Sequence, residues 1–176
     1  MKVTSMEEYG LRCMLQLALA QTDAPVSVAL VAKNEGLSAE YAGKLLNLLR
    51  QAKLVESVRG RNGGFVLANP PEDINMADIL RVFSHELFDV EYCNRFAGAE
   101  DECVHTTACT LRPVWSTLSD LVTETLESIS LMDLMCEESE VKRELDIQLG
   151  IVGPFGQRLF HISDNAQSGV AKQDER

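Results

Sequence analysis

Residues 54–67 of the chain are LVESVRGRNGGFVL, and this short segment predicts a β-hairpin. Apolar residues alternate before the turn and form a short run after it, which is typical of two paired strands. Asn62-Gly63 between them is a strong short-range hairpin signal. The connection is rich in glycine and carries Arg59 and Arg61. A glycine-rich basic hairpin of this kind is the wing of a winged helix when a helix-turn-helix precedes it.

Two helical segments stand directly before the hairpin. Residues 26–36 predict a short helix that Gly36 ends, because glycine is the residue that most easily adopts a left-handed C-terminal cap. Residues 39–52 predict a second helix with Ser38 as its N-cap, and four leucines supply its buried side. A short helix, a tight turn and a second helix form a helix-turn-helix. Together with the hairpin, they predict a winged helix.

The remaining elements flank this module. Residues 5–20 predict an amphipathic helix in which Ser5 is the N-cap and Glu8 completes a capping box. A short helix is expected over 75–83, and the segment 88–110 lacks helical or strand periodicity.

Residues 111–129 predict a long helix with a near-heptad apolar seam, formed by Leu111, Trp115, Leu118, Val122, Thr125 and Ile129. Such a seam usually packs against another helix, so we expect a homodimer. An acidic helix over about 131–145 is expected to follow, and then a disordered tail.

The expected fold class is mainly α with a small β-hairpin wing: a winged helix-turn-helix followed by a long dimerisation helix. The expected organisation is a DNA-binding domain (1–70), a connecting helix (71–87), a cysteine-rich cluster-binding loop (88–110), the dimerisation helix and acidic C-terminal helix (111–148), and a tail (149–176).

The distribution of charge matters more than its total. The net charge of −11 argues against binding to phosphates, but residues 41–64 hold five cations and one anion. Residues 71–147 hold 18 acidic and five basic residues. A basic patch on an acidic protein can bind DNA while the rest of the surface limits nonspecific binding. The residues expected to contact DNA are Ser38, Glu40, Tyr41 and Lys44 at the start of the second helix, and Arg59 and Arg61 on the hairpin.

Three cysteines, Cys93, Cys103 and Cys109, lie within the segment that lacks periodicity. Thiolates favour soft metals and iron–sulfur clusters, so this spacing indicates a cluster that needs a fourth ligand. His105 inside the loop and Glu8 from elsewhere in the fold or from a partner subunit are the candidates. Zinc bound by the three cysteines and His105, or thiols without a metal, are the alternatives.

The two other cysteines, Cys13 and Cys136, lie among apolar residues of predicted helices. We expect both to be buried as small hydrophobic side chains.

Three motifs resemble those of the Rrf-type regulators that include IscR, NsrR and RirA: MKVTSxxxYG at 1–10, LSxxY at 37–41 and LVxSVRGxxGG at 54–64. The resemblance implies a homodimeric winged helix with a two-iron or four-iron cluster bound by the three cysteines. IscR has a histidine ligand where this chain has Arg112. NsrR-like members use an acidic residue of the first helix from the other subunit, and Glu8 stands at that place. The resemblance therefore favours Glu8 over His105.

These observations predict a transcriptional regulator, by default a repressor. Its affinity for a double-stranded DNA operator is expected to respond through the cluster to redox state, nitric oxide, iron or cluster supply. The alternative is a winged-helix regulator without a cluster, controlled by a protein partner or by thiol oxidation. No nucleophile–base pair, P-loop or cofactor fingerprint indicates an enzyme. A signal pattern and a bilayer-spanning apolar run are also missing, so we expect a cytoplasmic protein with no membrane contact.

Overall fold

The computed structural model describes residues 3–20, 24–83, 96, 98, 102–105, 107–148 and 150. Contacts divide the chain into two units, Met1–Glu137 and Glu138–Arg176. The second unit contains the exposed acidic helix α6 (Glu138–Gln148), in which Lys142 Nζ pairs with Asp146 Oδ2 at 2.8 Å. None of the described helices combines the length and apolar character needed to span a bilayer.

Helix α1 (Ser5–Leu19) opens the first unit, and a capping box starts it one residue earlier than predicted. Thr4 is the N-cap: its Oγ1 accepts from the Glu7 backbone N–H at 3.3 Å, and its own N–H donates to Glu7 Oε2 at 2.6 Å. The prediction of Ser5 with Glu8 was therefore wrong. Thr4 and Glu7 have the same spacing, and Ser5 is already helical. Glu8 has no part in this cap.

Helices α2 (Val28–Glu35) and α3 (Ala39–Gln51) form the predicted helix-turn-helix. Ser27 caps α2 through a 3.2 Å hydrogen bond from the Leu30 N–H. Gly36 ends α2 with φ 66°, a left-handed conformation that glycine adopts without strain. Ser38 caps α3, since its Oγ accepts from the Tyr41 N–H at 3.1 Å. Both serines thus satisfy N–H groups that a helix start leaves without an internal partner.

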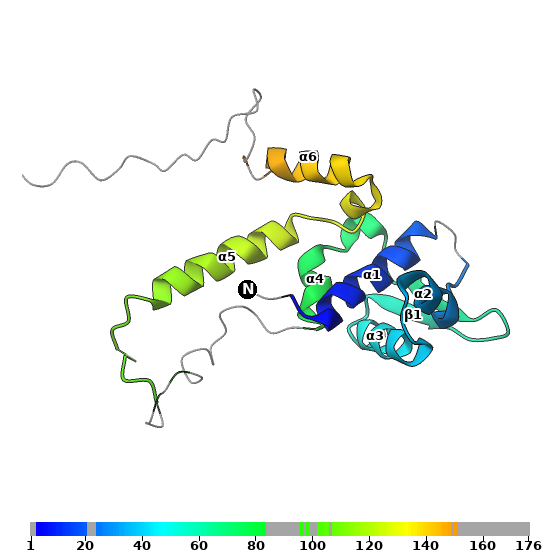
Figure 1. Ribbon diagram of the computed structural model, residues 1–176, viewed down its shortest axis with the longest axis horizontal. Helices are drawn as coiled ribbons and strands as arrows, with labels where there is room; N and C mark the ends of the chain where they lie inside the picture. Colours follow the sequence, from blue (N-terminus) through cyan, green and yellow to red (C-terminus); the bar gives the residue numbers. More distant parts are fainter. Residues whose placement is uncertain are drawn as a thin grey trace, which may run out of the picture. The chain divides into compact units, whose positions relative to one another are not determined.

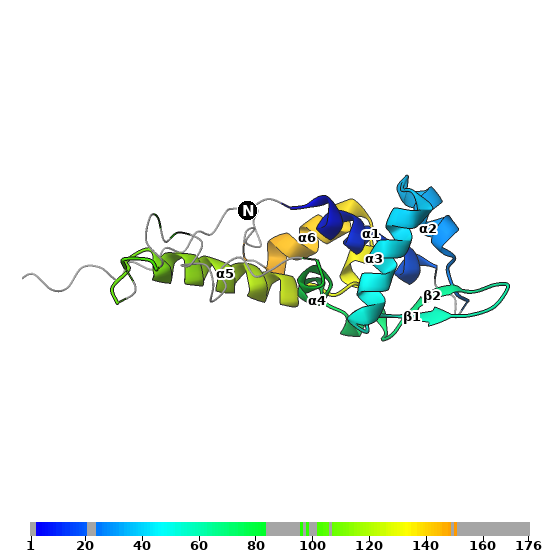
Figure 2. The ribbon, with the colours of Figure 1, turned by 90° about the horizontal axis from the view of Figure 1, so that it is seen from below.

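The wing is an antiparallel hairpin of β1 (Val55–Val58) and β2 (Gly64–Leu67), paired from Val55 opposite Leu67 to Val58 opposite Gly64. Its loop extends beyond the helices in both views (Figures 1 and 2). The glycine-rich segment that carries Arg59 and Arg61 connects the two strands, as predicted. Within it the Gly63 N–H donates to the Gly60 carbonyl at 3.0 Å, and Gly60 has φ 125°. This loop displays the wing arginines.

A backbone bridge ties the wing to the helix-turn-helix. Val26, just before α2, exchanges two hydrogen bonds of 2.9 Å with Phe65 of β2. Gly64 lies so close to this bridge that an added Cβ would be 2.2 Å from the Val26 carbonyl oxygen. Position 64 therefore requires glycine, because a side chain there would collide with the Val26 backbone.

The core lies between α1, the helix-turn-helix and the wing. Leu45, Leu46 and Leu49 of α3 are fully buried, as predicted, whereas Leu48 is partly exposed. The other buried apolar residues of this core are Leu11, Cys13, Met14, Leu17, Ala18, Val26, Val31, Val55, Phe65, Ile74, Ile79 and Leu131.

After the wing come η1 (Pro71–Asp73) and α4 (Met76–Arg81), and later the long helix α5 (Arg112–Glu127) and η3 (Asp133–Met135). The end of α5 lies beside α4, where Arg81 pairs with Glu127 (Figure 1).

Residues 129–131 then pair with 74–76. The Met76 N–H donates to Ile129 O at 2.8 Å, and the Leu131 N–H donates to Ile74 O at 2.7 Å. Ile129 is buried in this return segment. Its assignment to the apolar seam was therefore wrong, because α5 has already ended at Glu127.

We expect Gly64→Ala to lower the free energy of unfolding by about 1–3 kcal/mol, because the new methyl group pushes against the Val26 backbone. Urea denaturation at fixed protein concentration measures this change. Gly43→Ala on α3 is the matched control: its Cβ would be 3.7 Å from Val28 Cγ1, and alanine favours a helix by about 1 kcal/mol over glycine. Equal effects of the two substitutions would contradict the close contact at Gly64.

Candidate functional site

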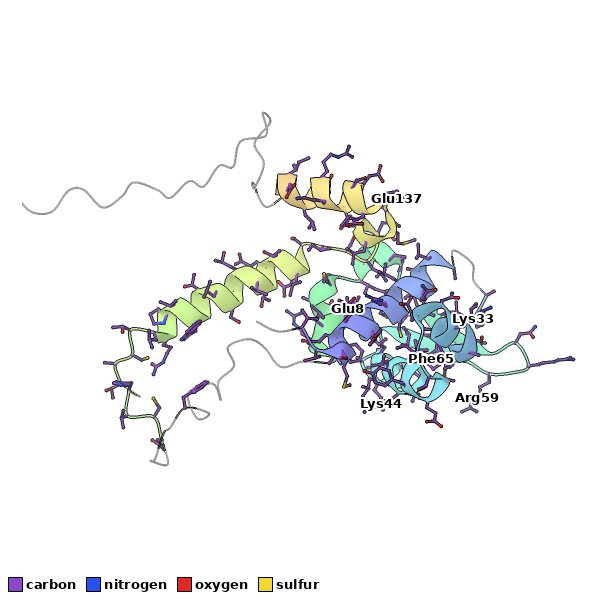
Figure 3. The ribbon with its side chains drawn as sticks, in the orientation of Figure 1. Glu8, Lys33, Lys44, Arg59, Phe65 and Glu137 are labelled. Carbon is purple, nitrogen blue, oxygen red and sulfur yellow. The ribbon has the colours of Figure 1, made fainter. Side chains whose placement is uncertain are left out.

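The first turns of α3 carry four of the residues predicted to contact DNA. Glu40 and Lys44 are exposed, and Figure 3 shows Lys44 on this helix. Ser38 is also exposed, but its hydroxyl oxygen already accepts the capping hydrogen bond from Tyr41. Tyr41 is half-buried, and its ring meets that of Tyr9 edge-on at 6.2 Å between centroids. Tyr41 therefore also links α3 to α1.

Exposed cations extend this surface onto the neighbouring elements. Arg59 and Arg61 are exposed on the wing loop, and Arg50 and Lys53 are exposed at the end of α3. Lys33, in the last turn of α2, is a further exposed cation that the sequence reasoning did not assign (Figure 3). The sequence could have indicated Lys33 as a DNA contact, because it lies just before the turn of the helix-turn-helix.

Glu8 is a half-exposed carboxylate on α1, labelled in Figure 3. Its Oε1 accepts from Arg12 Nε at 2.8 Å and lies 2.6 Å from Arg12 Nη2. This pairing raises the pKa of the Arg12 guanidinium, first through the hydrogen bond and then through the charge of Glu8. The Arg12 guanidinium also lies 5.6 Å from the centre of the Tyr9 ring.

Two of the three predicted cysteine ligands are among the described residues. Cys103 and Cys109 are partly exposed free thiols, and His105 between them is exposed. Cys93 lies outside the described residues. Across the described part of the chain, no three His, Cys, Asp or Glu side chains come together as a metal site requires.

The side chain of Arg112, at the start of α5, binds a backbone carbonyl of the cysteine segment. Its Nη2 donates to the His105 carbonyl at 3.1 Å. A guanidinium is always protonated and has no lone pair to offer a metal. Arg112 therefore orients this segment and cannot act as a ligand.

The two remaining cysteines differ from each other. Cys13 is completely buried, as predicted, and burial together with the charge of Glu35 raises the pKa of its thiol to about 12. Cys136 is exposed. The expectation that Cys136 is buried was wrong, because it follows η3 in extended backbone and does not lie on the apolar face of a helix.

Helix α5 exposes its apolar side. The large hydrophobic residues exposed on and just before it are Leu111, Val114, Trp115, Leu118 and Leu121. Within the described chain, Ser119 is the one buried residue of α5. Of the seam that the sequence predicted, Leu111, Trp115 and Leu118 are exposed, whereas Val122 and Thr125 are half-buried.

Comparison with known proteins identifies the family. Residues 3–137 match the Rrf2 family, described as an iron-dependent transcriptional regulator. The chain is 36% identical over 134 residues to the HTH-type transcriptional regulator CymR of Bacillus subtilis, with 76% of this chain and 89% of that protein covered. It is 34% identical over 148 residues to the regulator IscR of Aliivibrio salmonicida, with 84% of each covered.

Solved structures support the same family assignment. CymR of B. subtilis superposes with a TM-score of 0.63 at 32% identity, covering 77% of this chain and 96% of that one. T. potens IscR superposes with a TM-score of 0.60 at 34% identity, covering 77% and 86%. These relatives are transcriptional regulators and not enzymes. The fold, the family match and the relatives together show that this chain belongs to the Rrf2 family of winged-helix, DNA-binding transcriptional regulators.

Proposed function

We propose that this regulator is a homodimeric repressor whose affinity for its operator is controlled by an iron–sulfur cluster. Cys93, Cys103, Cys109 and Glu8 are the proposed ligands, with Glu8 supplied by the partner subunit. The observation that carries the proposal is the position of Glu8: its carboxylate is half-exposed on α1, has no role in the capping box, and pairs with the half-exposed Arg12 of the same helix.

The donor set fits such a group. Cys103 and Cys109 are partly exposed free thiols on a segment without helical packing, where a buried core cysteine would not lie. Thiolates are the usual ligands of iron–sulfur clusters, and a carboxylate oxygen is a weaker fourth donor that suits a labile sensor. Arg112 stands where IscR has a histidine ligand, which leaves Glu8 or His105 as the fourth donor. Glu8 is favoured because the NsrR-like members take an acidic ligand from the same place.

A bound cluster would supply a centre that reacts with oxidants and nitric oxide and is lost when iron is scarce. The protein's own residues connect the proposed site to the DNA-binding helices. Arg112 holds the cysteine segment against the start of α5, and Glu8 connects the site to α1. Because α1 packs on α3, a change at Glu8 reaches the DNA-binding helices.

The DNA interface is proposed to combine α3 with the wing. Glu40 and Lys44 are exposed in the first turns of α3, with Ser38 and Tyr41 at its start, and the N-terminal residues of a recognition helix are the ones that contact base edges. Arg59 and Arg61 extend from the wing and suit phosphates or a narrow minor groove. Two such units, one from each subunit, would read the two halves of an operator.

Dimerisation is proposed to occur through α5. Five large apolar residues are exposed on and just before α5, and a stable soluble monomer seldom shows so much apolar surface to water. Their near-heptad spacing is the pattern by which two helices pack along a shared seam. A second copy of α5 is the simplest partner with the same pattern.

The cluster is tested by purification without oxygen. We expect the wild-type protein to be coloured and to contain iron and sulfide, and Cys103→Ser to lose both while its thermal unfolding midpoint in the metal-free state stays unchanged. Cys136→Ser is the matched control and keeps the colour, since Cys136 is exposed outside the proposed site. A colourless, iron-free wild-type protein would contradict the proposal and leave a regulator controlled by a protein partner or by thiol oxidation.

The wing is tested by the salt dependence of DNA binding, with an operator selected from a random-sequence pool. Replacing Arg59 or Arg61 by alanine is expected to weaken binding and reduce the slope of log K against log salt by about 0.9 for each lost phosphate contact. Fluorescence anisotropy at several salt concentrations measures the slope. Lys142→Ala on α6 is the charge-matched control. A slope unchanged in both wing variants would exclude these phosphate contacts.

The seam is tested by sedimentation. Leu118→Lys places a charge on the exposed apolar side of α5 and is expected to convert the dimer to a folded monomer, because burying that charge without a partner is costly. Leu30→Lys, at an equally exposed leucine of α2, is expected to stay dimeric. If both variants sediment like the wild type, α5 is not the dimer interface.

A further inference from the structure

Helix α5 is attached to the winged helix through α4. The end of α5 packs on α4, α4 packs on α1, and α1 packs on α3, the proposed recognition helix. In Figures 1 and 2, α4 lies between the end of α5 and α1. Ala77 and Ile79 of α4 are buried, so α4 belongs to the packed unit. The angle between α5 and α3 is therefore set at the joint between α4 and the end of α5.

One part of this joint is backbone pairing. Just after α5, the Ile129 carbonyl accepts from the Met76 N–H at 2.8 Å, and the Leu131 N–H donates to the Ile74 carbonyl at 2.7 Å. Both hydrogen bonds lie at the start of α4, which begins at Met76. They fix the place at which α5 leaves the winged helix. The direction of α5 needs a second point of attachment.

Arg81 and Glu127 supply that second point. They are the last residues of α4 and α5, so their contact lies about 8 Å along α4 from the backbone bonds. Arg81 Nη2 donates to Glu127 Oε1, and this hydrogen bond is the largest cause of the raised pKa of the Arg81 guanidinium. Arg81 Nη1 also pairs with Oδ1 of Asp78, in the same helix, at 2.9 Å. One guanidinium thus holds Asp78 within α4 and Glu127 on α5.

A second attachment matters because a small turn at the joint is amplified across the winged helix. A unit of about 75 residues is roughly 20–30 Å across. Turning it by about 10° about its edge displaces its far side by roughly 3.5–5 Å, whereas one base pair rises about 3.4 Å. A joint that turned freely by this amount would let α3 reach operators whose half-sites differ in spacing by a base pair. A joint held at both ends of α4 restricts that turn.

We propose that Arg81 is a positioning residue that sets the spacing of the operator half-sites, by fixing through Glu127 the angle at which α5 leaves the winged helix. This inference rests on the proposed function, because it takes α5 as the dimer interface and a two-part operator as the ligand. In such a dimer the paired α5 helices form the centre, and each joint determines where its α3 meets the DNA. Arg81 acts on specificity without touching DNA.

The exposure of the pair limits the size of the effect. The side chains of Arg81 and Glu127 are 44% and 46% exposed. An ion pair in such contact with water changes an equilibrium constant by at most about fivefold, so the two joints of a dimer give at most about 25-fold. The pair of Arg81 with Asp78 is similarly exposed. It joins two residues of α4, however, and does not constrain α5.

The test compares operators that differ only in half-site spacing, with all proteins purified without oxygen. One base pair inserted or deleted at the centre of the selected operator moves the half-sites by about 3.4 Å and turns one relative to the other by about 34°. Fluorescence anisotropy measures the dissociation constant for each operator at one salt concentration. We expect the wild type to bind the selected spacing at least about tenfold tighter than either altered one, comparable to the cost of one mismatched base pair. Arg81→Gln and Glu127→Gln are each expected to reduce this ratio by at least about threefold.

Two further variants show whether the contact itself is responsible. Asp78→Asn removes the pair of Arg81 within α4 and is the matched control, which keeps the wild-type ratio. Arg81→Gln combined with Glu127→Gln is expected to match the single variants, because both act through one contact. Thermal midpoints and sedimentation verify that every variant is folded and dimeric. Equal binding of all spacings by the wild type, unchanged ratios in both single variants, a reduced ratio in Asp78→Asn, or additive effects in the double variant would overturn the proposal.

Sedimentation separates this inference from the proposed function. If the wild type is a dimer that Leu118→Lys dissociates, but Arg81→Gln and Glu127→Gln keep the wild-type spacing ratio, the role of Arg81 is excluded and the proposed function remains. If the wild type is a monomer, or if Leu118→Lys stays dimeric, the proposed dimer through α5 fails. The inference about Arg81 then fails with it.

Discussion

Burial of one side of α3 is the interaction on which the rest of the DNA-binding unit depends. Leu45, Leu46 and Leu49 are fully buried against α1 and the wing, and burial of each such side chain contributes roughly 1.5–3 kcal/mol. A helix held along one side presents the other side in a fixed orientation, and that exposed side carries Glu40 and Lys44. The same packing holds α1 against the helix-turn-helix. The polar residues between α1 and α2 therefore occupy a boundary whose geometry the core sets.

Much of the fold was predictable because its signals are local. Ser38 marks a helix start through its side-chain oxygen, and Gly36 marks a helix end through its left-handed backbone. A glycine-rich segment between two apolar runs is typical of a hairpin. The errors arose where two local solutions compete or where distant residues decide. Thr4 offers the same capping spacing as the residue after it, so the sequence alone did not distinguish them. Ile129 continues the apolar repeat of the long helix, yet it is buried because it pairs with a segment more than fifty residues earlier.

The candidate site was predictable only in part, for the same reason. The exposed cations of α3 and the wing follow from their places in a recognised motif, and Cys13 follows from its apolar surroundings. The pairing of Arg12 with Glu35 was not predicted, because it joins two helices and no sequence spacing encodes a contact between helices. Tyr41 was expected only as a DNA contact. Its packing against Tyr9 depends on how α1 crosses α3, which the amphipathic pattern of each helix does not specify.

The return of the chain at 129–131 determines where this protein tolerates insertions and deletions. The segment that leaves the winged helix after α4 comes back to pair with the residues directly before α4, and Leu131 is buried in the core. The whole excursion, with its cysteines and its long helix, is thus inserted between two fixed anchor points. Residues added to or removed from the cysteine loop alter the length of this insertion and leave the core contacts of the winged helix in place.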